Sequence, residues 1–204
     1  MKSFVFGFVV GIVLLVLAVF GYFVSGRVPV GTLERAMPFE RTLAGGALRA
    51  RIQKEMPKAV PIPANEATYL AGAQIYKDQC AVCHGAPGNP ITAIAKGMFP
   101  KPPQLFRGKG VTDDEPGETY WKVANGIRLS GMPGFKQSLT EAQMWQVSLL
   151  LANADKLPGS VKQALGTSAA FAAPVSLPGN SPASAPTPAV PAASPTTSPE
   201  TAPH

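Results

Sequence analysis

The stretch Cys80-Ala81-Val82-Cys83-His84 contains both cysteines of the 204-residue chain and one of its two histidines. The other histidine, His204, is the last residue. Two cysteines are too few for a small domain that is held together by disulfides. Both thiols and the one internal imidazole of the sequence therefore lie within five residues, and this motif indicates the chemistry of the surrounding domain.

The spacing C-x-x-C-H is the attachment signature of c-type haem. Two thiols that are separated by two residues reach two vinyl groups on one edge of the porphyrin. The imidazole of the next residue, His84, then lies beneath the iron. The motif therefore predicts one haem c, bonded covalently to Cys80 and Cys83.

Three other uses of two closely spaced cysteines remain as alternatives. A thioredoxin-like site needs a strand before the motif, and the sequence predicts none there. A structural disulfide between Cys80 and Cys83 leaves His84 without a role. A zinc site lacks a fourth ligand, because the chain has no further cysteine or nearby histidine.

A haem iron in an electron carrier takes a sixth ligand, and methionine is an established partner of histidine. Of the six methionines, Met98 and Met132 follow the motif at suitable distances. Met132 is favoured because glycine and proline surround it in Gly131-Met132-Pro133-Gly134 and fix such a loop. Met144 falls on the apolar side of the last predicted helix, which favours a place in the core.

Residues 65–157 have the signals of a small helical domain, and no run alternates as a strand does. The start and stop signals are Asn65 before 66–79, Pro116 before a segment ending at Asn125-Gly126, and Thr140 with Gln143 before a segment ending near Ala154. They correspond to side-chain caps, a proline in the first turn and a glycine stop. The fold class is therefore all-α.

The attachment motif, Pro102-Pro103-Gln104-Leu105, Asn125-Gly126-Ile127-Arg128 and Gly131-Met132-Pro133 closely resemble class I mono-haem cytochromes c of the membrane-anchored bacterial type. The resemblance spans about residues 65–155 and implies a cytochrome c-like fold around one covalent haem. The roles it implies are thioethers at Cys80 and Cys83, iron ligands at His84 and Met132, a Pro103 carbonyl that accepts the His84 Nδ1–H, haem packing by Leu105, and a helix pair in which Gly72 and Tyr76 meet Trp145.

Several side chains near these motifs keep two interpretations. Tyr120 and Trp121 suit either the haem pocket or the core. Four cations are candidates for pairing with haem propionates, and the sequence does not rank them: Arg107, Arg128, Lys101 and Lys136.

Residues 4–24 are an unbroken apolar run of 21 residues, long enough as a helix to cross a bilayer. We expect an uncleaved anchor over residues 1–25. Cleavage as a signal peptide near Val24-Ser25-Gly26 is the alternative. Gly7 and Gly11 form a G-x-x-x-G pattern that weakly predicts a helix dimer.

The rest of the chain divides by composition. Residues 26–64 form a basic linker, with one predicted helix at 37–56 that is followed by Pro57, Pro61 and Pro63. Residues 158–204 are rich in proline and alanine and predict a disordered tail. Most of the surplus positive charge lies in the linker. This placement suits anionic lipid headgroups and excludes a nucleic-acid-binding face on the domain.

The predicted function is electron transfer, not catalysis. A membrane-anchored cytochrome would carry single electrons between a donor and an acceptor protein, with the haem domain on the periplasmic face of the cytoplasmic membrane. The alternatives are a haem c subunit of a larger membrane oxidoreductase complex and, with less support, a haem sensor or peroxidase.

Overall fold

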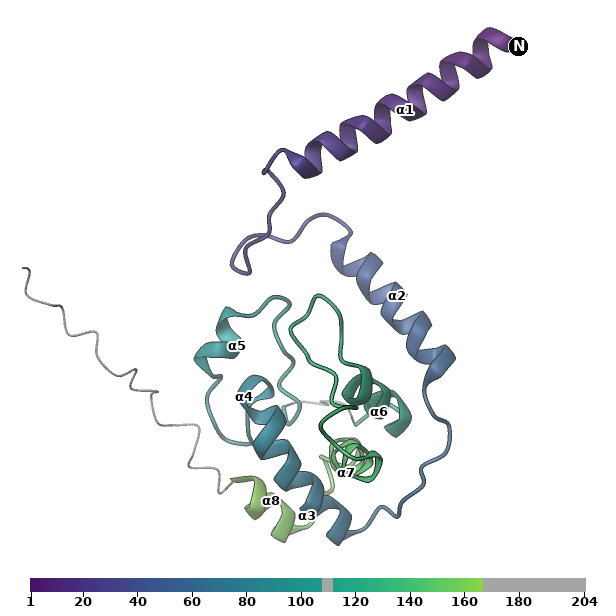
Figure 1. Ribbon diagram of the computed structural model, residues 1–204. Helices are drawn as coiled ribbons and strands as arrows, with labels where there is room; N and C mark the ends of the chain where they lie inside the picture. The colour runs from purple at the N-terminus through teal and green to yellow at the C-terminus, as the bar shows by residue number, and fades with distance from the viewer. Residues whose placement is uncertain (108–111, 167–204) are drawn as a thin grey trace, which may run out of the picture. The chain divides into compact units, whose positions relative to one another are not determined.

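The computed structural model describes residues 1–107 and 112–166 of the chain (Figure 1). These residues are all-α, as predicted, and their one β-type contact is an isolated bridge between Ile127 and Met132. The elements are α1 (Lys2–Val24), α2 (Glu40–Glu55), α3 (Glu66–Ile75), the π-helix η1 (Tyr76–Cys80), α4 (Ala81–His84), α5 (Ala93–Gly97), α6 (Pro116–Asn125), α7 (Glu141–Ala152) and α8 (Gly159–Gly166).

Helix α1 is the predicted apolar N-terminal helix. It has 23 residues, a mean hydropathy of 2.9 in its most apolar window, and no buried residue. Its length and composition suit a membrane span, and a signal sequence has the same properties. A Cβ at Gly7 or Gly11 would meet no atom within 4 Å, so both glycines are open on the helix surface. Dimerisation through them stays a prediction.

The first helix of the domain begins where its cap predicts. The Asn65 Oδ1 accepts the Thr68 N–H at 2.9 Å. The helix does not continue as one α-helix to residue 79, however, because η1 follows at Tyr76 and α4 at Ala81. The wider π turn comes directly before the Cys-x-x-Cys-His motif, where it changes the direction in which the following side chains point.

The other predicted helix ends are confirmed. Pro116 is the first residue of α6, and Gly126 stops that helix with φ +68°. Helix α7 begins with a complete capping box: the Gln143 N–H donates to Thr140 Oγ1, and the Thr140 N–H donates to Gln143 Oε1. These signals act within one turn of helix, which is why the sequence alone suffices to place them.

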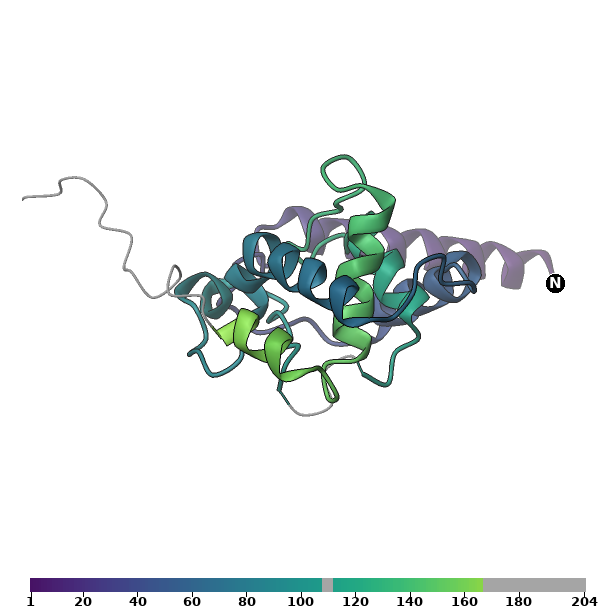
Figure 2. The ribbon, with the colours of Figure 1, turned by 90° about the horizontal axis from the view of Figure 1, so that it is seen from below.

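Helices α3 and α7 cross closely and form the centre of the core (Figure 2). A Cβ built at Gly72 would lie 2.4 Å from the Gln146 carbonyl oxygen and 3.1 Å from Leu150 Cβ. Trp145 stacks on Tyr120 of α6, with ring centroids 4.3 Å apart. The implied helix pair is therefore present, and the ring partner of Trp145 comes from α6.

Helix α8 differs from the predicted tail. We expected disorder from residue 158, but Gly159–Gly166 forms a helix that packs on α3. Val161 and Leu165 lie one turn apart on its inner face and are fully buried. The composition of the long proline-rich segment conceals this short apolar pattern. The predicted tail beyond residue 166 lies outside the described residues.

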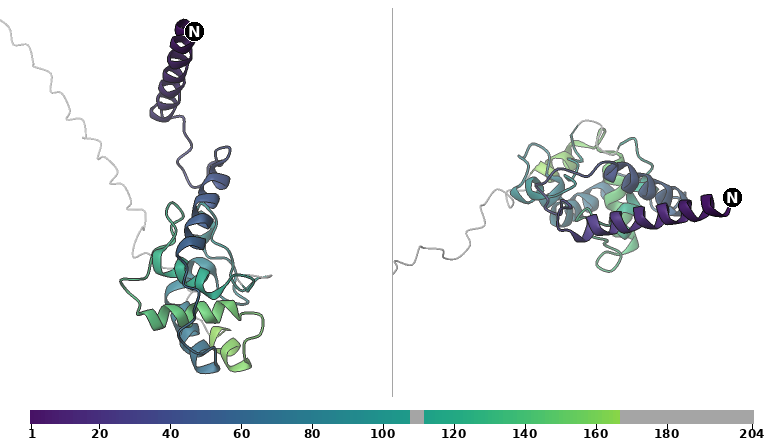
Figure 3. Two further views of the ribbon diagram at one scale, coloured as in Figure 1. Left: turned by 90° about the vertical axis from the view of Figure 1, so that its right-hand side faces the viewer. Right: turned by 90° about the horizontal axis from the view of Figure 1, so that it is seen from above.

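Helix α2 confirms the helix predicted within residues 37–56, and it packs on α6 (Figure 3). Ile52 and Met56 are 2% and 4% exposed. Burial of this degree is typical of a core, so the second half of the basic linker is part of the folded domain.

Replacing Gly72 with alanine is expected to lower the free energy of unfolding by about 1–3 kcal/mol, because the added methyl group pushes the backbones of α3 and α7 apart. Gly45→Ala in α2 is the matched control, since a Cβ there meets no atom within 4 Å and alanine favours a helix. Chemical unfolding of the full chain in detergent, followed by circular dichroism, measures both. Equal effects of the two substitutions would contradict the close crossing.

Candidate cofactor site

A cavity of ≈350 Å³ lies beside the Cys-x-x-Cys-His motif. One wall consists of the motif side chains Cys80, Cys83 and His84. The loop around Met98 and the loop at 131–133 contribute two further walls, and α6, α7 and α2 contribute the remaining surface. Most of this lining is apolar, which is typical of a pocket for a large flat cofactor.

The imidazole of His84 is held by a backbone carbonyl, that of Pro103. Its Nδ1 lies 2.8 Å from the Pro103 carbonyl oxygen. A carbonyl only accepts, so Nδ1 donates the proton and Nε2 keeps a free lone pair. Burial lowers the pKa of His84, against the opposing effect of the Pro103 bond, and this favours the neutral ring. A neutral imidazole with a fixed tautomer is the form that binds a metal.

The two cysteines are free thiols in the structure. Burial, with a smaller contribution from Cys83, raises the pKa of Cys80 to about 12. Reactive Cys-x-x-Cys pairs have a low thiol pKa instead. Together with the helical context of the motif, this argues against the thioredoxin-like alternative.

The two candidate methionines lie at the same cavity. Both Met98 and Met132 line it, and a Cβ at Gly131 would come within 2.9 Å of Met98 Cε. Backbone bonds hold the Met132 loop: the Ile127 N–H donates to the Met132 carbonyl at 3.1 Å. Met144 is buried in the core, as predicted.

Thr119 and Lys122 add polar groups to the cavity wall. Thr119 is 4% exposed, and its hydroxyl has no partner among the described residues. The ammonium of Lys122 lies 2.7 Å from Glu118 and 3.0 Å from Asp114. A buried hydroxyl without a partner beside an apolar cavity fits a ligand with an apolar body and polar edges, which describes haem.

The donor set of the cavity also fits haem better than zinc. Among the described residues, no three His, Cys, Asp or Glu side chains come together as a metal site. One neutral imidazole, two thioether sulfurs and two thiols on one wall match the iron ligands and attachment points of a haem c. The described residues therefore do not supply the four ligands that the zinc alternative needs.

Some of the other predicted site residues line the cavity and others do not. Leu105 is buried at the cavity wall, and Lys101 also reaches it. In the part of the chain that the structure describes, the remaining propionate candidates Arg107, Arg128 and Lys136 do not line the cavity, and neither do Tyr120 and Trp121.

Sequence reasoning did not single out several cavity residues, among them Leu48, Thr119 and Lys122. Glu118 and Lys122 are four residues apart, and this spacing predicts a pair on a helix. The sequence does not show, however, that this pair lies on the face of α6 that lines the cavity. Leu48 had no such signal, because it lies far from the motif in the sequence.

Comparison with known proteins gives a family for the segment that contains most of this site. Residues 67–149 match the family model described as "Cytochrome C oxidase, cbb3-type, subunit III". This segment is a class I-like c-type cytochrome domain, so the predicted resemblance is confirmed. No curated protein matches the chain.

One solved structure with a match is a chain of the reducing HAO-like protein complex of Kuenenia stuttgartiensis. It is 21% identical with a TM-score of 0.41, over 61% of this chain and 67% of that chain. A likeness of this size carries no argument about function.

The substitution Tyr76→Phe tests the packing beside the motif. The buried Tyr76 hydroxyl donates to the Gly85 carbonyl at 2.6 Å, directly after His84. Its loss leaves that carbonyl unpaired and is expected to lower the free energy of unfolding by about 1–3 kcal/mol. Tyr69→Phe is the control, because the Tyr69 hydroxyl makes no hydrogen bond to another described residue. A Tyr76→Phe variant no less stable than the control would refute this role.

Lys122 predicts a pH dependence. Burial lowers its pKa, but the bonds to Glu118 and Asp114 outweigh burial and raise the pKa above the ordinary lysine value. Protonated Lys122 therefore stabilises the fold below that value, and the contribution is lost as the pH rises above about 10. Unfolding from pH 8 to 11 should show a steeper loss of stability in the unaltered chain than in Lys122→Met. Parallel curves would contradict the paired lysine.

Proposed function

We propose that the chain is a membrane-anchored cytochrome that carries single electrons through one covalent haem c. Cys80 and Cys83 would form the thioethers, and His84 and Met132 would bind the iron. The observation that carries the proposal is the 2.8 Å contact between His84 Nδ1 and the Pro103 carbonyl. It leaves the second ring nitrogen free as a ligand beside two thiols at the same cavity.

The residues around the cavity have separate tasks in this proposal. A haem c held there would supply a one-electron iron couple. The Pro103 carbonyl fixes the His84 ring and raises its basicity. The loop at 131–134 holds the Met132 sulfur, and Leu105 excludes water from the wall beside it. A low-dielectric pocket with a thioether ligand favours ferrous iron and so raises the reduction potential.

The proposed location is the outer face of the cytoplasmic membrane. The class I-like domain implies extracytoplasmic haem attachment, and α1 has the length of a membrane span. The N-terminus would then lie in the cytoplasm, and the haem domain would face its redox partners in the periplasm. The partners would be a donor and an acceptor protein.

A second candidate is a haem c subunit of a larger membrane oxidoreductase complex. The matching family model is that of an oxidase subunit, which favours it. A stoichiometric complex that survives mild solubilisation would distinguish this subunit from a separate carrier. A sensor or peroxidase is less favoured, because such proteins need a weak or absent sixth ligand and two methionines line this cavity.

Substitution of Met132 tests the proposed ligand set. In Met132→Ala the haem should stay attached, because the thioethers are intact, while the reduction potential falls with the loss of the sulfur ligand. Met98→Ala is the matched control, since Met98 lines the same cavity. Redox titration and the near-infrared sulfur-to-iron band measure both variants. Loss of the band in Met98→Ala alone would assign the ligand to Met98.

A further inference from the structure

Helix α2 lies outside the matched cytochrome segment 67–149, yet one of its side chains reaches the cofactor cavity. Leu48 lines the cavity together with His84 and Met132. Leu43, five residues earlier and therefore on another side of the helix, is 72% exposed. Only one face of α2 is therefore directed at the domain.

That face is a continuous apolar stripe. Leu48, Ile52 and Met56 are spaced four residues apart, which places them one above the other on a helix. Ile52 and Met56 are almost fully buried against the domain. A helix that was free in solvent would not bury two large side chains in this way, so α2 is docked on the domain.

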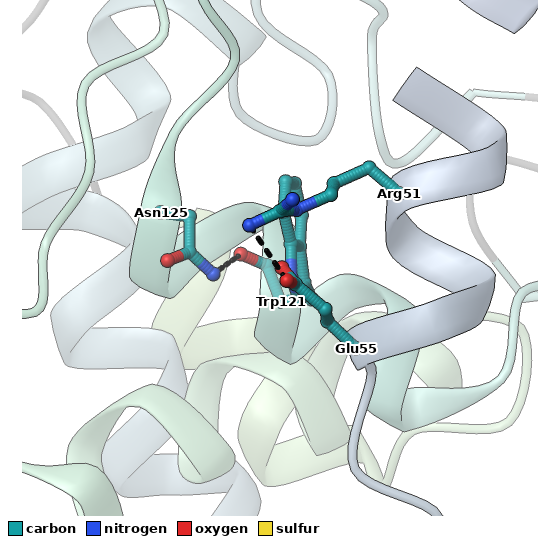
Figure 4. Close-up of polar contacts among 4 residues, drawn as sticks. All are labelled: Arg51, Glu55, Trp121 and Asn125. Carbon is teal, nitrogen blue, oxygen red and sulfur yellow. Dashed lines mark hydrogen bonds and ion pairs between the residues drawn. The ribbon is translucent and has the colours of Figure 1, made fainter. Parts of the chain in front are cut away.

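A polar cluster fixes the same end of the helix (Figure 4). The Trp121 indole N–H donates to Glu55 Oε2 at 3.2 Å, and Arg51 pairs with Glu55 Oε1 at 2.7 Å. The Asn125 amide donates to the Trp121 carbonyl at 3.0 Å within α6. These groups are partly exposed, so they contribute less free energy than the apolar stripe, but they set the register of α2 on α6.

The backbone after α2 is also fitted to α6. A Cβ at Gly117 would lie 2.0 Å from the Pro57 carbonyl oxygen, so no larger residue fits at that position unless the linker moves. The contact continues the docking past the end of the helix. This contact also explains why position 117 is a glycine, because the residue packs against the linker after α2.

The beginning of α2 contacts the loop that follows Met98. The Arg41 guanidinium lies 5.6 Å from the ring centroid of Phe99, directly after Met98. Helix α2 thus contacts the Met98 loop near its beginning, the cavity in its middle and α6 at its end. A flexible tether would make no such contacts with the domain. Contacts at three places along α2 therefore indicate that the helix is a fixed part of the domain surface.

We propose that α2 is a permanent wall of the haem site, in which Leu48 contacts the bound group and excludes water on that side. The proposal rests on the proposed haem function. It also shortens the free tether to residues 26–39, a stretch of chain that spans at most about 50 Å. The haem domain would accordingly move over a smaller range than a 39-residue linker allows.

Leu48→Asn in the full, haem-loaded chain in detergent tests the wall. Asparagine admits water and a polar group to the cavity, which stabilises the ferric state, so the reduction potential should fall. Leu43→Asn is the matched control: it makes the same change in the same helix on the exposed face, and its potential should equal that of the unaltered chain. Equal potentials in the two variants would overturn the proposal.

Hydrogen exchange provides a second measurement that needs no substitution. A separate helix of 16 residues is marginal in water, so its amides exchange fast. The docked helix should protect the amides of residues 48–55 at least tenfold more than those of 26–39. Equal exchange in the two segments would overturn the wall. If no variant carries haem, the proposed function fails; if haem is present and these differences are absent, only the wall fails.

Discussion

The arrangement of the domain depends on the contact between two helix backbones at Gly72. Because this residue has no side chain, α3 meets the Gln146 carbonyl of α7 at a distance that any Cβ would prevent. The contact orients η1 and α4, which continue from α3 and carry the Cys-x-x-Cys-His motif. It also brings Leu151 of α7 to the cavity wall. The position of the candidate cofactor site thus depends on the absence of a side chain at residue 72.

The chemistry of the site depends on groups that burial keeps neutral. His84 donates through Nδ1 and so retains one lone pair, and before haem attachment burial raises the pKa of the Cys80 thiol to about 12. Lys122 at the cavity wall lies between two carboxylates, which compensate its charge. An apolar cavity with neutral donors suits a cofactor whose own charge changes by one electron, because the protein then sets the cost of that change.

The sequence predicted those features that depend on neighbours in the chain. Asn65, Pro116 and the Thr140 capping box each act within one turn, and each helix begins where they indicate. The attachment motif and the Met132 loop likewise pointed to one cavity, and the sequence favoured Met132 as the ligand, while the structure places Met98 at the same cavity. Features that depend on distant contacts were not predictable in this way. The docking of α2 depends on its contact with α6. Helix α8 depends on the burial of Val161 and Leu165 where it packs on α3, and the local sequence does not show this contact.

The intact mass of the denatured protein, purified from membranes of a host that matures c-type cytochromes, tests the central claim most directly. Denaturation removes every group that is not covalently bound. The account predicts the mass of the full chain plus one haem, which would establish the thioethers at Cys80 and Cys83 and the retained N-terminal helix together. A chain without haem, or one lighter by two hydrogens as a Cys80–Cys83 disulfide requires, would contradict it.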